Sequence, residues 1–95
     1  MGQLRTQAKA LSAQVKEGDA HAAKALLEHS VNLRHGNLAV RRFFLARGMG
    51  ASIPDNAKLY CSSVLKNLSL DAVVKIAQEE YLKALTYKKR RKRDG

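Results

Sequence analysis

The chain has 95 residues, a net charge of +10 and hydrophobic residues at 45% of its positions. This length suits one domain with a modest core, and the hydrophobic share excludes wholesale disorder. Cys61 is the only cysteine, which excludes intrachain disulfides and argues against a zinc finger and against a secreted disulfide framework.

Apolar residues repeat at helical spacing along the chain, and most of the glycines and the single proline fall between the repeats. No strand-type alternation is present. We therefore predict an all-α fold, a compact bundle of about five short helices with a basic C-terminal tail. The helical domain covers residues 1–87 and the tail residues 88–95. The predicted helices span residues 3–16, 20–35, 38–47, 54–67 and 70–87.

The first two predicted helices each carry one apolar face. The stripe of the first is Leu4, Ala8, Leu11 and Val15. Gly18 is expected to end this helix, and Asp19 to cap the start of the next. The inner face of the second helix is Ala22, Ala23, Leu26, Ser30 and Leu33. Gly36 is expected to follow its last turn in a left-handed conformation.

The third predicted helix is apolar on nearly all sides. Its apolar positions are Leu38, Val40, Phe43, Phe44 and Leu45. Asn37 is expected to cap its start, and Gly48 to close its end. A helix that is apolar all round is buried, so we predict that this helix is the centre of the bundle.

Segment 48–51 is expected to be a flexible connector, and Ser52 to open a capping box with Pro54 in the first turn of the fourth helix. The inner face of that helix is Ala57, Tyr60, Cys61, Val64, Leu65 and Leu68. Cys61 on this face is expected to be an inert buried thiol. Ser69 is predicted to cap the last helix. The predicted core stripe of the last helix is Leu70, Val73, Val74, Ala77, Tyr81, Ala84 and Leu85.

The excess positive charge lies in two segments. Residues 29–54 carry four arginines and no acidic residue, and residues 88–95 carry six cations and one acidic residue. Charge segregated in this way indicates a surface that binds anions. The candidate nucleic-acid-binding residues are Arg34, Arg41, Arg42, Arg47, Lys88, Lys89, Arg90, Arg91, Lys92 and Arg93.

Both segments also have a simpler interpretation. Arg34 and Arg47 lie near predicted helix C-termini, where a cation complements the helix dipole. The run 88–93 can continue the last helix or fray, and we expect fraying without a ligand because like charges four residues apart disfavour a helix. A run this dense nevertheless pairs readily with phosphates through counterion release.

No catalytic grouping stands out, and the spacings of His21, His29 and His35 do not suit a metal site on a helix. We expect no enzyme activity, no cofactor and no metal. The expected function is non-enzymatic association with DNA or RNA through the tail and the arginines. The alternative is a small inhibitor or adaptor, of the kind that phages and plasmids encode, that docks on an acidic protein partner. Its contact residues would be Leu59, Ile76, Leu82 and Tyr87.

The apolar runs are too short to span a membrane, and no signal-peptide pattern is present. We expect a cytoplasmic protein, or a nuclear one in a eukaryotic host, since the tail also fits a nuclear localisation signal. Residues 1–6 match a short myristoylation pattern. Membrane binding is not expected, because the basic run lies at the opposite end of the chain.

Overall fold

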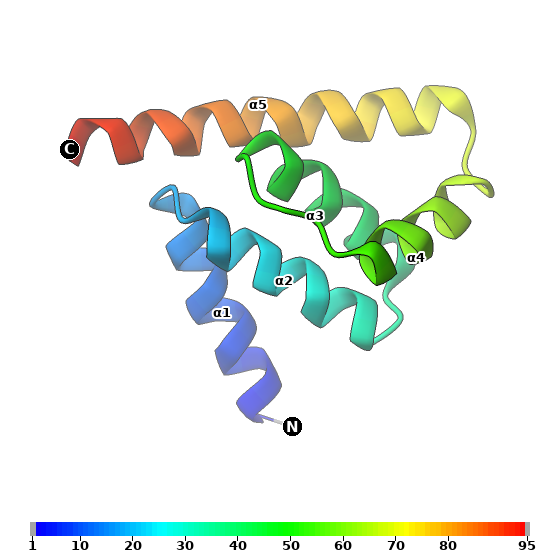
Figure 1. The fold of residues 1–95 in the computed structure, drawn as a ribbon, viewed down its shortest axis with the longest axis horizontal. Helices are drawn as coiled ribbons and strands as arrows, with labels where there is room; N and C mark the ends of the chain where they lie inside the picture. Colours follow the sequence, from blue (N-terminus) through cyan, green and yellow to red (C-terminus); the bar gives the residue numbers. More distant parts are fainter. Residues whose placement is uncertain (1, 95) are drawn as a thin grey trace.

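Five helices form the structure, and residues 2–94 contain no strand (Figure 1). The computed structural model describes the backbone of residues 2–94 and the side chains of residues 7–90, so the acylation pattern at residues 1–6 lies outside the described side chains. The helices are α1 (Gly2–Lys16), α2 (Ala20–Asn32), α3 (Gly36–Gly48), α4 (Asp55–Leu65) and α5 (Leu70–Asp94). The prediction of an all-α bundle of five helices is confirmed, although α5, with 25 residues, is longer than expected.

Helix α3 is the centre of the bundle and packs against α2, α4 and α5. Helix α1 packs mainly on α2, and α5 lies along the opposite side of α3 (Figure 1). The buried residues of α3 are Ala39, Val40, Phe43, Leu45 and Ala46. Because neighbours cover α3 from several directions, its apolar residues can point nearly all round the helix axis, as predicted.

Two helices begin at the side-chain caps that the sequence predicts. Asp19 Oδ1 accepts hydrogen bonds from the amides of His21 and Ala22 at 2.9 and 3.2 Å. Ser69 Oγ accepts one from the amide of Ala72 at 3.2 Å. Both caps satisfy amides that have no partner within the helix.

Gly18 ends α1 with a φ of 95°, as predicted. The expected capping box at Ser52 is wrong. Helix α4 starts at Asp55, with Pro54 at the cap position and no side-chain cap hydrogen bond.

The connection between α2 and α3 comprises residues 33–35, earlier in the chain than the predicted residues 36–37. Arg34, with a φ of 59°, takes the left-handed conformation that was expected at Gly36. Gly36 instead begins α3, and a Cβ there would lie 3.2 Å from Val64 Cγ2. The cap position of α3 is therefore His35 rather than Asn37, and the His35 side chain makes no cap hydrogen bond.

Gly48 lies where α3 and α5 approach each other closely. A Cβ at Gly48 would lie 2.8 Å from both Ala84 Cβ and Tyr81 Cδ1. Gly48 is therefore a packing position inside α3, and Gly50, with a φ of 85°, takes the left-handed conformation after the helix. Met49 is buried in the core, so segment 48–51 is packed rather than the flexible connector that was predicted.

Two apolar clusters make up the core. The buried residues of the first are Val15, Ala22, Ala23, Leu26, Leu45, Ala46, Met49 and Ala84. Those of the second are Leu27, Val31, Ala39, Val40, Phe43, Ala57 and Cys61. Tyr87 packs partly buried against the first cluster and Ile76 against the second, although both were expected to be exposed contact residues. Leu59 and Leu82 are exposed as expected.

Helix α5 turns a different face to the core from the one that its apolar residues predict. Ala84 is buried as predicted, but Leu70, Val74 and Leu85 are 77%, 45% and 56% exposed. Glu80, expected outside the core stripe, is 3% exposed. The predicted stripe is therefore wrong at its two ends, since close packing at Gly48 and the pairing of Glu80 outweigh the burial of three large apolar side chains.

The basic run 88–93 continues α5 as far as Asp94 instead of fraying as expected. Arg90 Nη1 donates a hydrogen bond to the backbone carbonyl of Lys16 at 3.3 Å. This carbonyl lies in the last turn of α1, where the helix dipole favours a cation. The contact stabilises the start of the basic run against the body of the protein.

We predict that Gly48→Ala destabilises the protein by about 1–3 kcal/mol, because the added methyl group overpacks the contact between α3 and α5. Chemical denaturation followed by circular dichroism measures this change. Gly36→Ala is the matched control at the other end of α3, where the neighbouring Val64 methyl need move only slightly. A Gly48→Ala protein as stable as the control would contradict the close approach.

Candidate functional site

The structure divides the four predicted arginines among three places. Arg41 and Arg42 line a cleft of about 230 Å³ between α1, α3 and α5. Arg34 lines a separate hollow of about 260 Å³ at the end of α2, where its guanidinium carbon lies 5.7 Å from the centre of the Tyr60 ring. Arg47 is exposed in the last turn of α3 and lines neither of these two hollows.

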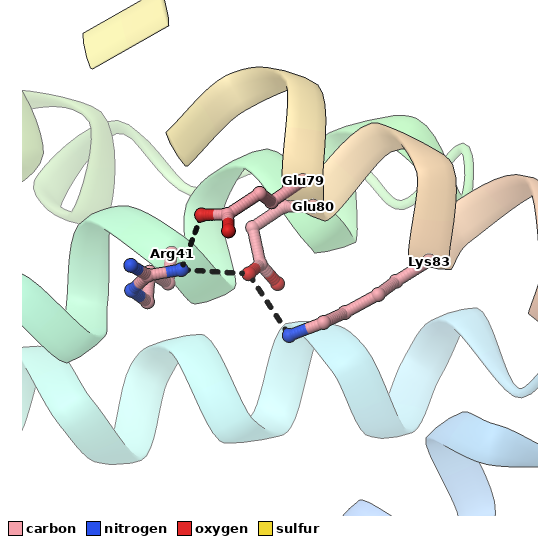
Figure 2. Close-up of polar contacts among 4 residues, drawn as sticks. All are labelled: Arg41, Glu79, Glu80 and Lys83. Carbon is pink, nitrogen blue, oxygen red and sulfur yellow. Dashed lines mark hydrogen bonds and ion pairs between the residues drawn. The ribbon is translucent and has the colours of Figure 1, made fainter. Parts of the chain in front are cut away.

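A buried carboxylate holds Arg41 at the cleft. Arg41 Nη1 lies 3.2 Å from Glu80 Oε2 and 3.4 Å from Glu79 Oε1. Lys83 Nζ reaches the same Glu80 oxygen at 3.1 Å (Figure 2). Helical spacing brings Lys83 near Glu80, whereas Arg41 arrives from α3. These two cations offset the cost of burying the Glu80 charge.

Arg42 is held by α2 rather than α5. Its Nη1 donates to Ser30 Oγ at 2.6 Å and to the Leu26 carbonyl at 3.2 Å. Ser30 is buried, and its hydroxyl donates to the same Leu26 carbonyl at 3.0 Å. Burial lowers the pKa of Arg42 below its usual value, yet a guanidinium stays charged at neutral pH.

The cleft combines an apolar floor with a cationic rim. The remaining lining residues are Ser12, Val15, Lys16, Leu26, Leu38, Leu45, Glu80, Lys83 and Tyr87. The sequence does not mark Lys16 or Lys83 as binding residues, because each lies in a segment of nearly balanced charge. One feature of the sequence could have indicated the α5 side of the cleft. Lys83, Tyr87 and Arg90 are spaced by four and three residues, which places them on one side of a helix.

The basic run begins directly after Tyr87, which lines this cleft. Lys88, Lys89 and Arg90 are exposed, and Arg90 binds the carbonyl of Lys16 on the cleft rim. The residues at 91–93 continue α5, and their side chains lie outside the described part of the structure.

The outward side of α5 carries exposed apolar residues. Leu70, Val74, Leu82 and Leu85 are all exposed, and Leu59 on α4 is exposed as well. Of the contact residues proposed for the alternative function, Leu59 and Leu82 lie at the surface, whereas Ile76 and Tyr87 pack against the core clusters.

Within the side chains that the structure describes, no three His, Cys, Asp or Glu residues gather to hold a metal ion. No helix of residues 2–94 combines the length and the apolar character needed to cross a membrane. No known protein family, curated protein or solved structure matches the chain.

We predict that Glu80→Gln lowers the free energy of unfolding by about 1–3 kcal/mol, because it weakens the hydrogen bonds from Arg41 and Lys83 to a buried acceptor. Glu79→Gln is the control, since Glu79 is half exposed and meets the same arginine. Its loss should be under ~1 kcal/mol. Urea denaturation measures both losses of unfolding free energy. Equal losses in the two variants would show that the burial of Glu80 does not strengthen its ion pairs.

Cys61 is buried in the second cluster, and burial raises the pKa of its thiol to about 11 from an ordinary 9.0. We predict that the folded protein reacts with iodoacetamide at pH 8 at least about a hundredfold more slowly than the urea-unfolded chain, because little of the folded protein's thiol is in the thiolate form. The same raised pKa means that the folded state binds the thiol proton more tightly than the unfolded state, so the free energy of unfolding falls as pH rises from 9 towards 11. Mass spectrometry follows the alkylation, and equal rates in buffer and urea would contradict the prediction.

Proposed function

We propose that this protein binds nucleic acid without catalysing a reaction, and that the basic end of α5 is its main contact. The observation that carries this proposal is that Lys88, Lys89 and Arg90 are exposed on a helix, while every ion pair among the described side chains involves Glu79 or Glu80. Cations without acidic partners release the counterions of a phosphate backbone when they bind it.

The helical form of the run favours contact with phosphates on several sides. Successive positions of a helix are rotated by about 100°, so Lys88, Lys89 and Arg90 face different sides of α5, and the helical backbone continues through the cationic positions 91–93. Such a helix fits the major groove of DNA or lies across a phosphate backbone. Because the contacts go to phosphates, we expect binding that depends weakly on base sequence.

Arg41 and Arg42 have a secondary part in this proposal. Both are engaged within the protein, Arg41 with two carboxylates and Arg42 with Ser30 and the Leu26 carbonyl. They add positive charge to the cleft beside the basic end of α5, whereas Arg34 and Arg47 lie apart from it.

A second candidate function is docking on the acidic surface of a protein partner. The observation that favours it is the exposure of Leu70, Val74, Leu82 and Leu85 on the outward side of the helix that carries the basic end. An apolar helix side next to a cationic end suits a partner with an apolar contact patch bordered by acidic residues.

We predict that replacing Lys88, Lys89 and Arg90 together by Gln weakens binding to duplex DNA and flattens the dependence of log K on log salt by roughly 2–3, since about three phosphate contacts are lost. Fluorescence anisotropy across a salt series measures both effects. Circular dichroism verifies that the variant remains helical.

The matched control replaces three exposed lysines elsewhere by Gln and removes the same charge. These lysines are Lys58, Lys66 and Lys75. The control should keep nearly the whole salt dependence. Equal losses in the two triple variants would mean that net charge alone drives binding, and absence of binding by the unaltered protein at low salt would overturn the proposal.

A further inference from the structure

The cleft between α1, α3 and α5 joins two chemistries that no single helix provides. Its floor is apolar, with Leu38, Leu45 and Val15, and Tyr87 forms part of its wall. Its rim is cationic, with exposed Lys16 and the partly exposed side chains of Arg41 and Lys83. A ligand that matches both parts has an apolar body and a negative charge a short distance away.

The volume of the cleft limits what can enter it. At about 230 Å³ it is smaller than the roughly 300–1,000 Å³ of sites that enclose drug-sized molecules. A single ring system fits this volume better than a cofactor. Leu38 lines the cleft and is 39% exposed, so part of its apolar surface is accessible to a ligand.

A cationic rim could attract either an acidic peptide or a nucleotide, and Glu80 favours the nucleotide. Its carboxylate is buried in the cleft and already binds Arg41 and Lys83. A second carboxylate, from an acidic peptide, would be repelled there. Adenine, cytosine and guanine each carry an amino group that can donate a hydrogen bond to a carboxylate, as cytosine N4 does to Glu. The phosphate of the same nucleotide would remain at the rim.

The cleft also lies in line with the proposed phosphate contact. Lys83, Tyr87 and Arg90 follow one another along one side of α5, and Arg90 binds the Lys16 carbonyl at the rim. Lys83 and Arg90 are seven residues apart, about 10.5 Å along the helix axis. A strand that leaves the cleft along α5 therefore meets a cation within two helical turns.

We propose that this cleft binds one unpaired base of a single-stranded nucleic acid, and that it prefers a base with an amino group facing Glu80. The apolar floor and Tyr87 would contact the ring, as in other single-strand sites, and Lys16 and Lys83 would contact the adjacent phosphate. A paired base cannot enter, because its amino group is engaged and its faces are stacked. This inference rests on the proposed nucleic-acid binding and adds a preference for single strands and for base type.

The test compares oligo(dC) with oligo(dT). Cytosine presents an amino group at the ring position where thymine presents a carbonyl group, and thymine also carries a methyl group on the neighbouring carbon. Fluorescence anisotropy at fixed salt should show about tenfold tighter binding of oligo(dC), the effect of one charge-assisted hydrogen bond. Glu80→Gln should abolish this preference, because an amide can donate to thymine as well as accept from cytosine. Glu79→Gln, which alters the neighbouring exposed carboxylate, should keep it.

Because Glu80→Gln also destabilises the fold, a second pair of variants tests the cleft without changing Glu80. Leu38→Gln places an amide on the cleft floor and should weaken single-strand binding severalfold while leaving duplex binding unchanged. Leu82→Gln makes the same substitution at an exposed position outside the cleft and should change neither.

Three results would overturn the inference. Equal binding of the two strands, insensitive to Glu80→Gln and Leu38→Gln, would remove the cleft from binding and leave the basic end of α5 as the contact. Binding of polyglutamate that Leu38→Gln weakens would assign the cleft to an acidic peptide instead. Absence of binding to every strand and duplex at low salt would overturn the proposed function along with it.

Discussion

The burial of the Glu80 carboxylate is the interaction on which the position of α5 depends. A charged group with 3% exposure is stable only beside opposite charges, and Arg41 and Lys83 provide them. Because Arg41 belongs to α3, the ion pair attaches the longest helix to the central one. Once Glu80 faces inward, the rotation of α5 is determined, and Leu70 and Val74 are left at the surface.

The absence of a side chain at Gly48 makes the close contact between α3 and α5 possible. Gly48 lets the backbone of α3 approach Ala84 and Tyr81 more closely than any other residue would. Ala84 lies one turn after Glu80, so the steric contact and the ion pair act on one face of α5. Phe44 adds an edge-to-face contact with Tyr81, with ring centres 5.8 Å apart. Together these contacts outweigh the hydrophobic gain that a different rotation would bring.

The rotation of α5 also determines where the charges meet. It places Lys83 and Tyr87 opposite Lys16 of α1 and leaves a cleft between the helices. It brings Arg90 to the last turn of α1, which stabilises the first part of the basic run. The binding of a phosphate backbone by the run and of a base by the cleft would thus depend on one arrangement of α5.

The all-α class, the approximate extent of the helices, the caps at Asp19 and Ser69 and the central place of α3 could be predicted from the sequence, because apolar periodicity and capping chemistry are local properties. The sequence also located the two basic segments. The inward side of α5, the role of Gly48 and the meeting of Lys16 and Lys83 with Arg41 and Arg42 at one cleft became visible only in the packed helices. These features depend on distances between residues far apart in the chain, and the periodicity of one helix carries no information about which residue of another helix will lie opposite.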